Sequence, residues 1–296
     1  MKTLKTAFCL GILFFLNHQG FIEAHADTID ETQFIFVDGI FGDYLKQNFG
    51  PAFHHLDSEH PAAEKIVIRP KTDNAIEVNA ELTFQKINEF RFTSAKKKTV
   101  IVAHSKGGAE TLVMLLRHPE AIRLWGLEKV VLVSAPLAGT DVIDVVQHFC
   151  ADVPKSTCDE LYQRLPVLDA FTPVKMKALV TESMNRPSSA DRALLESKIY
   201  YVRTQMKETD FYSPLYFPHT YLSLIHPEEK QNDGIIATRN ELIYEHGFDG
   251  TDGDHVFGTD LGIFMGDHNS LLNSTSFQNT EAKRQLFFKN LLQWIR

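Results

Sequence analysis

The sequence has few cysteines, no excess of basic charge and, beyond residue 26, no long hydrophobic run. Only 3 of its 296 residues are cysteine, and 38 acidic residues face 30 basic ones. The resulting net charge of −8 argues against a protein that grips a phosphate backbone, so we expect no nucleic-acid partner. Because no later stretch is apolar and long enough to cross a bilayer, we expect no transmembrane segment.

The first 26 residues have the pattern of a secretory signal peptide. Two early lysines precede an apolar run at residues 6–16, and Ala24-His25-Ala26 then forms a small-residue cleavage site. The alternative interpretation is a buried first helix. We expect cleavage after Ala26, a secreted or periplasmic location, and a mature domain of residues 27–296.

The cysteine count of the mature chain is even. Cys9 lies within the apolar run and leaves with the signal, so only Cys150 and Cys158 remain. An even pair in an oxidising compartment favours a disulfide, and the loop between these two is short. The alternative is two free thiols.

Short apolar runs alternate with helical patterns along the mature chain. The runs are rich in β-branched residues and predict buried strands at residues 34–37, 66–68, 99–103, 129–133 and 198–202. Apolar spacing predicts helices at residues 74–95, 109–116 and 281–296. This alternation predicts an α/β fold, with a mostly parallel sheet flanked by helices.

The region from about 141 to 197 breaks this rhythm. It has helical apolar spacing, several prolines and both mature cysteines. We therefore expect an inserted helical cap rather than a core strand–helix unit.

Ser105 lies in the turn between a predicted strand and a predicted helix. A serine hydroxyl is a weak nucleophile until a base takes its proton, so it must project from the backbone. A tight strand-to-helix turn projects it, and such a turn needs small residues two before and two after the serine. Ala103 and Gly107 meet that need, and Gly108 gives room for helix–strand packing. The alternative is an ordinary helix-capping serine.

The segment Val-Ala-His-Ser-Lys-Gly-Gly at 102–108 resembles the nucleophile elbow of the α/β-hydrolases, in particular of secreted bacterial triacylglycerol lipases. Residues 36–42 resemble the oxyanion loop of that family, and residues 134–141 resemble its Gly-Ala-Pro-His-x-Gly-Ser-Asp segment. Residues 232–236, Asn-Asp-Gly-Ile-Ile, resemble the segment that carries the acid. The likeness covers most of the mature chain, and the cap matches least.

The resemblance implies a catalytic triad of Ser105, Asp233 and His268, in the chain order of this family. His268 would take the proton of Ser105 and return it to the leaving alcohol, while Asp233 would hold the imidazole tautomer. Backbone N–H groups of Ile40 and Lys106 would bind the oxyanion.

Other residues compete for two of these positions. Asp141, Asp144 and Asp267 are alternative acids, and His255 is an alternative base. His104, beside the nucleophile, is expected to pack rather than to act as the base.

The sequence departs from the family at Asp38, where a histidine is common. We expect the Asp38 side chain to turn outward and cap the loop backbone. Ser270 stands where relatives have a calcium-binding aspartate. The aspartates at 249, 252 and 254 miss the EF-hand spacing, and His54, His55 and His60 fit no common metal site and suggest a solvated loop. We therefore expect no metal and no organic cofactor, and a structural calcium at the three aspartates is the alternative.

These features together predict a secreted serine hydrolase that cleaves carboxylic esters through an acyl-enzyme. The expected substrate is a lipid acyl ester or a small ester, with transient contact to a lipid interface. A phospholipase or an acyltransferase using the same triad is one alternative. A non-catalytic lipid-binding protein that kept the fold is another.

Overall fold

The strands of the protein form one parallel sheet. The structure is a computed structural model that describes residues 27–40, 49–151, 159, 166–211, 213, 215–227, 230–244, 255–270 and 281–295. The strand order is β2-β1-β3-β4-β5-β6, and every neighbouring pair is parallel. The strands are β1 (Thr32–Val37), β2 (Glu64–Ile68), β3 (Lys98–His104), β4 (Leu127–Val133), β5 (Ile199–Gln205) and β6 (Thr259–Met265).

Each of the five apolar runs predicted as strands forms one of β1 to β5. The sixth strand, β6, lies at the edge of the sheet and was not expected. Most of its residues are half-buried or exposed, and Gly262 interrupts it, so it lacks the continuous apolar pattern of a buried strand. The predicted fold class, a parallel sheet flanked by helices, is confirmed.

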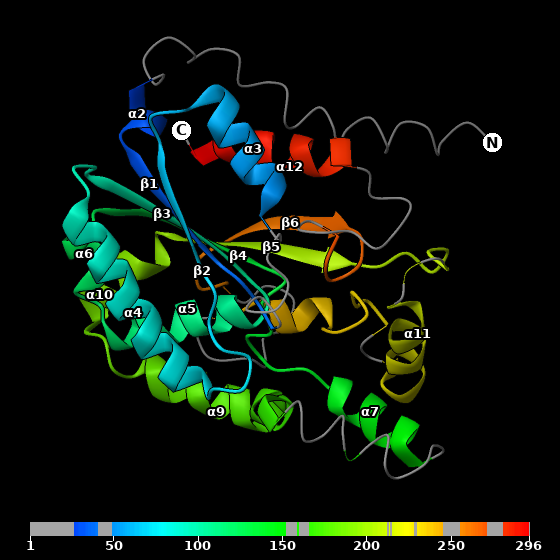
Figure 1. Cartoon of the computed structure of the whole chain (residues 1–296). Helices are drawn as coiled ribbons and strands as arrows, with labels where there is room; N and C mark the ends of the chain where they lie inside the picture. Colours follow the sequence, from blue (N-terminus) through cyan, green and yellow to red (C-terminus); the bar gives the residue numbers. More distant parts are fainter. Residues whose placement is uncertain are drawn as a thin grey trace.

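Helices cover both faces of the sheet (Figure 1). Alternate strand residues point to opposite faces, and two apolar clusters result. One contains Ile35, Ile101 and Leu132 and is covered by α4 and α5. The other contains Phe36 and Val102 and is covered by α3 and α12. The helices are α2 (Asp27–Asp30), α3 (Gly50–Glu59), α4 (Ile76–Thr93), α5 (Lys106–Arg117), α6 (Ala121–Leu124), α7 (Val142–Ala151), α9 (Pro173–Met184), α10 (Ser189–Glu196), α11 (Tyr216–Ile225) and α12 (Glu281–Ile295).

The segment expected to be a solvated histidine loop is instead mostly a helix. His54 and His55 lie on α3, whose Ala52 and Leu56 pack into the core beside α12. His60 follows the helix and is buried. The expectation was wrong because it considered only the three histidines. Ala52 and Leu56, four residues apart, lie on one face of a helix and form its apolar side.

The region predicted to be a cap divides into two parts. Met176 and Val180 of α9 and Leu195 of α10 are buried in the main core, and α9 packs against α5. This part is therefore a crossover between β4 and β5 rather than a cap. The first helix of the region, α7, packs against α11, on the side toward which β5 and β6 run (Figure 1).

The carboxyl ends of the strands lie at one edge of the sheet, because all six strands are parallel. In open parallel sheets this edge is where ligands bind. Asp38 follows β1, Ser105 follows β3, and His268 comes three residues after β6. Among the helices that the structure describes, none has both the length and the hydrophobicity to span a membrane.

Candidate active site

Ser105 occupies a sharp turn between β3 and α5. Its backbone has φ of 54° and ψ of −129°, a conformation that is strained for a residue with a side chain. The turn is held by close packing on both sides. A Cβ at Gly107 would overlap the carbonyl oxygen of Asp38, and a Cβ at Gly108 would lie 2.6 Å from Cβ of Ala135. Glycine at both positions is therefore required by the packing, as the sequence predicted.

The turn brings Ser105 to His268 and Asp233, which come from distant parts of the chain. Nε2 of His268 lies 2.7 Å from Oγ of Ser105, and Nδ1 of His268 lies 2.7 Å from Oδ2 of Asp233. All three side chains are buried. An ionised carboxylate can only accept, so Nδ1 donates its proton to Asp233 and Nε2 of the neutral ring is left to accept from the serine hydroxyl.

Asp233 is held by donors on both of its oxygens. Oδ1 accepts the amides of Ile235 and Ile236 at 2.9 and 2.8 Å, and Oδ2 also accepts the hydroxyl of Thr204 at 2.7 Å. Burial alone raises the pKa of Asp233, but the His268 ring and these hydrogen bonds outweigh it and hold the pKa below its ordinary value. The carboxylate is therefore ionised at neutral pH.

A glycine turn shapes this acid loop. Gly234 has a φ of +94°, and a Cβ there would lie 2.7 Å from Cβ of Leu215. A side chain at this position would be strained and would displace Asp233, so the glycine of the Asn-Asp-Gly segment has a structural reason.

Two polar residues behind Asp233 were not found from the sequence. The hydroxyl of Ser134 lies 2.8 Å from that of Thr204 and donates to it, because Thr204 gives its own proton to Asp233. Glu241 accepts the backbone amide of Thr204 at 3.2 Å with both oxygens. Burial and the negative charge of Asp233 raise the pKa of Glu241 well above its ordinary value. Both effects favour the protonated, neutral form of Glu241.

His104 supports the main chain of His268. Its Nε2 lies 2.9 Å from the carbonyl oxygen of His268 and must be the donor in this bond. Burial, together with the nearby His268 ring, lowers the pKa of His104 to about 3. His104 is thus a neutral, fixed side chain that holds the histidine loop, consistent with the expectation that it packs and is not the base.

The alternative acids and the alternative base are bonded elsewhere. Asp267 accepts the hydroxyls of Ser213 and Ser270, each at 2.8 Å. His255 pairs with Glu196 on the molecular surface.

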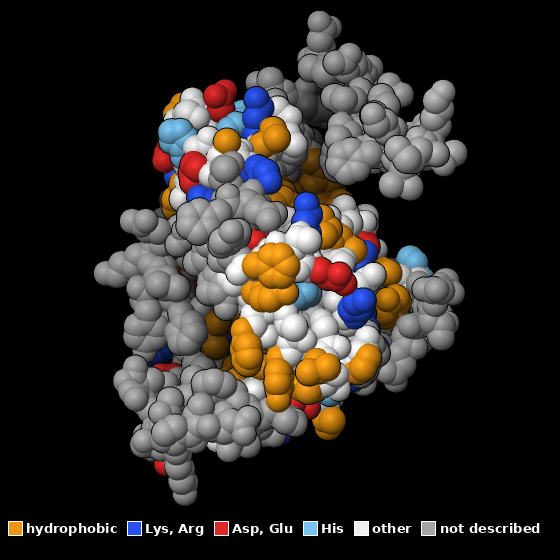
Figure 2. All heavy atoms as spheres, turned by 90° about the vertical axis from the view of Figure 1, so that its right-hand side faces the viewer, with side chains coloured by type: hydrophobic (Ala, Val, Ile, Leu, Met, Phe, Trp, Pro, Cys, Tyr) orange, Lys and Arg blue, Asp and Glu red, His pale blue; other side chains and the backbone are white. Residues whose placement is uncertain are grey.

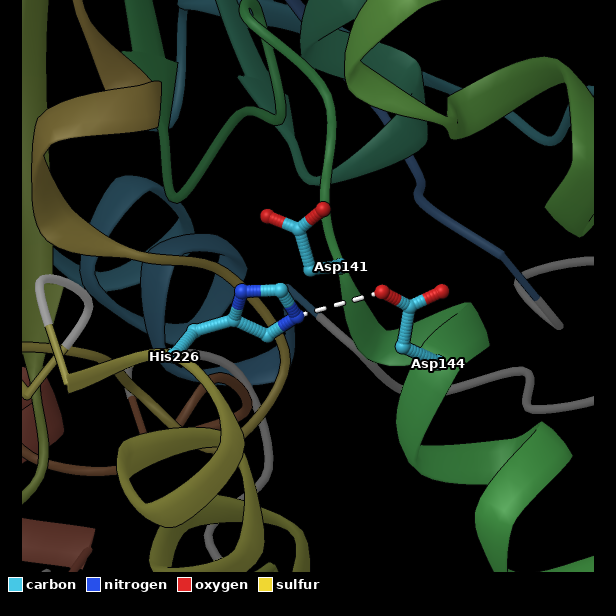
Figure 3. A group of neighbouring side chains, drawn as sticks. All are labelled: Asp141, Asp144 and His226. Atoms are coloured by element: carbon cyan, nitrogen blue, oxygen red, sulfur yellow. Dashed lines mark hydrogen bonds and ion pairs between the residues drawn. The ribbon is translucent and has the colours of Figure 1, made fainter.

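The other two alternative acids lie together in a different group. Asp144, on the first turn of α7, accepts a hydrogen bond from Nε2 of His226 at 3.1 Å (Figure 3). Asp141 lies beside them, and each of the three residues offers one ligand atom within 4.8 Å of the others. Within the described ranges this is the one group that presents three metal-ligand atoms. All three side chains are partly exposed, and the prediction that the protein has no metal stays a prediction.

The two predicted oxyanion donors lie on the segments that flank Ser105. Gly39, directly before Ile40, packs on the nucleophile, since a Cβ there would lie 2.7 Å from Cβ of Ser105. Lys106 begins α5, so its amide has no acceptor within the helix. Both residues thus lie on segments next to the serine, and the role of their amides in binding an anion stays a prediction.

Asp38 does not turn outward. Its carboxylate is fully buried, and Oδ2 lies 3.3 Å from Nε of Arg69, which follows β2. The expectation was wrong because a capping aspartate is exposed, whereas this one is neutralised by an arginine from the neighbouring strand end.

Some predicted features lie outside the described residues. Cys150 is near the end of α7, but Cys158 is not described, so the disulfide stays a prediction. The same holds for the signal peptide at 1–26 and for the aspartates at 249, 252 and 254.

No protein-family model matches the sequence, and no curated protein does. The structure is similar to that of lipase BlEst2 from Bacillus licheniformis, with a TM-score of 0.62 and 18% identity over 89% of this chain and 91% of that one. It is also similar to a metagenomic carboxyl esterase, with a TM-score of 0.61 and 15% identity over 90% of this chain and 76% of the other. Phospholipase PlaB from Legionella pneumophila matches with a TM-score of 0.52 and 13% identity over 90% of this chain and 57% of that protein.

These likenesses show the fold. The chain has the α/β-hydrolase fold, the class that the alternation of strands and helices and the resemblance at its elbow predicted.

Proposed function

We propose that the protein is a serine hydrolase that cleaves carboxylic esters through an acyl-enzyme on Ser105. The observation that carries this proposal is the hydrogen-bonded chain from Ser105 through His268 to Asp233, at 2.7 Å in both bonds. In this arrangement the imidazole takes the serine proton as Oγ attacks the ester carbonyl. The imidazolium formed faces an ionised carboxylate, which stabilises its charge.

The remaining steps use the same groups. The tetrahedral oxyanion accepts hydrogen bonds from the amides of Ile40 and Lys106, strengthened by the positive end of the α5 dipole. His268 gives its proton to the departing alcohol, and a water molecule activated by His268 then hydrolyses the acyl-enzyme. All proton transfers in this scheme are made by side chains of the protein.

Lipid acyl esters are the proposed substrate class. Exposed apolar side chains gather on the face that carries α11 (Figure 2), and they include Phe211, Phe217 and Leu224. This helix adjoins the acid loop, because His219 of α11 hydrogen-bonds Asn232 at 2.8 Å. An exposed apolar surface next to the reacting groups supports contact with a lipid interface. With the predicted signal peptide, the proposed location is secreted or periplasmic.

The test is covalent labelling of Ser105 followed by ester hydrolysis. Wild-type protein is expected to react with a fluorophosphonate at Ser105, whereas Ser105→Ala stays folded, unlabelled and almost inactive. A wild-type protein that neither labels nor hydrolyses any ester would refute the hydrolase function and favour the lipid-binding alternative. A series of nitrophenyl esters from acetate to palmitate, with and without detergent, then tests the substrate. Peak activity at acetate without a response to an interface would leave a plain esterase.

The acyltransferase alternative is tested with the same enzyme. Adding a primary alcohol to the assay and measuring both the free acid and the new ester separates hydrolysis from transfer. Hydrolysis predicts that the free acid remains the main product.

A further inference from the structure

The two segments that carry the proposed oxyanion donors are both fastened to one loop. This loop follows β2 and spans residues 69–74, which we name the clamp loop. It lies outside the triad and resembles no motif that the sequence suggested. The inference below rests on the proposed function, since it concerns the groups that would bind the oxyanion.

Lys106 is fastened to the clamp loop by its side chain. Its Nζ lies 2.9, 3.0 and 3.2 Å from the carbonyl oxygens of Lys71, Thr72 and Asn74. It also lies 3.1 Å from Oε1 of Glu110. The side chain is only 3% exposed, so this ammonium has exchanged water for four protein oxygens. Three N–H groups are fully satisfied by such a set, which is the condition for burying a charge.

Glu110 and Asn79 complete this anchor. The amide of Asn79 donates to Oε1 of Glu110 at 2.6 Å and to the carbonyl of Lys71 at 2.8 Å. The anchor therefore joins α4, α5 and the clamp loop. Because Lys106 is the first residue of α5, its amide and its side chain leave the same Cα, and fixing Nζ restrains the amide.

Asp38 is fastened to the other end of the clamp loop. Its buried carboxylate pairs with Arg69 at 3.3 Å, and its amide donates to the carbonyl of Ile68 at 3.0 Å. Two residues further along the chain comes Ile40, the second proposed donor. The carbonyl of Asp38 also contacts Gly107, so the two donor segments touch each other as well as the clamp loop.

We propose that the clamp loop sets the spacing of the two oxyanion donors, with Lys106 and Arg69 as its positioning residues. Donors stabilise an oxyanion only when they lie within about 3 Å of the position where it forms. A displacement of about 1 Å can lower the rate by about a hundredfold. Substrate binding in the ground state makes little use of these donors, so the clamp acts on kcat and leaves KM nearly unchanged.

The first experiment compares Lys106→Met with wild type and with Lys86→Met. Lys86 lies on the exposed face of α4, so its substitution removes one charge without touching the clamp loop. With nitrophenyl butyrate, Lys106→Met is expected to lower kcat by about ten- to a hundredfold. KM is expected to stay within about threefold of wild type, and Lys86→Met to behave as wild type.

A boronic acid separates positioning from a general loss of structure. It forms a tetrahedral adduct with the serine and so reports on the oxyanion site directly. Its affinity for Lys106→Met is expected to fall by the same factor as kcat/KM, while fluorophosphonate still labels the full amount of enzyme. An unchanged boronate affinity, or a loss of labelled enzyme that accounts for the loss of rate, would overturn the proposal.

The second experiment tests whether both positioning residues act through the same loop. Asp38→Asn keeps the shape of the side chain and removes its charge pair with Arg69, so it serves even if Lys106→Met does not fold. It is expected to lower kcat by about tenfold. The double variant is expected to lose less than the product of the single losses, because one loop transmits both. Independent, multiplicative losses would contradict a shared clamp.

The two proposals fail in different ways. A wild-type protein that neither labels nor hydrolyses any ester refutes the hydrolase function. An active wild type with an equally active, folded Lys106→Met refutes only the clamp.

Discussion

Asp233 and Glu241 are two buried carboxyl groups that share a neighbour, Thr204, but their pKa values are shifted in opposite directions. Both are almost fully buried, and burial alone would neutralise both. Asp233 receives hydrogen bonds from two amides, one hydroxyl and one imidazole, and its pKa is lowered. Glu241 receives one shared backbone amide from Thr204, and its pKa is raised. Hydrogen-bond donors and neighbouring charges, and not the depth of burial, decide in which direction each pKa moves.

Glu110 is intermediate between these two. Its Oε1 accepts from Lys106 and Asn79, and burial, opposed by these two partners, raises its pKa to about 7. The three carboxyls thus follow a series in which more donors give a lower pKa. The predictions below test this series.

The largest effect is expected for Asp233→Asn. An amide can donate to Nδ1 of His268 and thereby favour the wrong tautomer of the ring. We expect kcat/KM to fall by about 10⁴-fold, with the thermal midpoint of unfolding close to that of wild type. Steady-state kinetics and a thermal melt measure both quantities. A loss below about tenfold would mean that another carboxylate serves His268.

Glu110→Gln is expected to change how stability depends on pH. The folded pKa of about 7 lies above the ordinary value of 4.5, so folded Glu110 holds a proton that the unfolded chain has lost between these values. Its contribution to stability is therefore complete below pH 4.5 and is lost as the pH rises to about 7. As the pH rises through this window, wild type loses this stability and Glu110→Gln does not. The unfolding free energy of the variant minus that of wild type should therefore increase by up to about 3 kcal/mol.

Urea unfolding at pH 5 and at pH 7.5 measures this difference. Glu89→Gln, at an exposed position of α4, is the control and should show no such change. If the unfolding free energies of wild type and Glu110→Gln change with pH in parallel, Glu110 is ionised throughout this window. The pKa of Glu110 would then not be raised, and the proposed order of the three carboxyl groups would be wrong.

Thr204→Val is expected to have a smaller effect. It removes the hydroxyl that donates to Asp233 and leaves the remaining three donors in place. The loss of one hydrogen bond to a charged group is worth about 1.5 kcal/mol, so we expect kcat to fall by about tenfold. Thr204→Ser keeps the hydroxyl and should retain activity near wild type. Equal activity in both variants would show that this donor is unnecessary.

The smallest effect on activity is expected for Glu241→Gln. The raised pKa of Glu241 favours its neutral form, and glutamine is a neutral amide of the same shape that can still accept the amide of Thr204. We expect kcat to stay within about twofold of wild type between pH 6 and pH 9. A fall of tenfold or more would mean that Glu241 carries a charge that the reaction uses.

The sequence predicted the features that depend on neighbouring residues. The strands β1 to β5 contain apolar runs that predict them. The small residues around Ser105 predict its sharp turn. Asp233 and His268 were predicted from short segments that resemble family motifs in the same chain order. The structure joins both residues to the site by hydrogen bonds.

Features that depend on distant pairs were not predictable in this way. Asn79 meets Glu110 across 31 residues, and Thr204 meets Asp233 across 29. Nothing local distinguishes Glu241 from an exposed glutamate, or the buried Asp38 from a capping aspartate. The environments of these two side chains depend on packing between elements that are distant in the chain. Local sequence patterns do not predict such packing.

The position of α12 has a consequence for how the protein is made. Its Phe288, Leu291 and Leu292 cover the same apolar face that Phe34 and Phe36 of the first strand present. During synthesis α3 can cover part of that face early, but the part that α12 covers stays open until more than 250 further residues, the span from Phe36 to Phe288, have been added. This side of the core therefore closes only after α12 has been synthesised, and the nascent chain exposes aggregation-prone aromatic surface until then. Chaperones that bind exposed aromatic segments are expected to bind β1 during this interval.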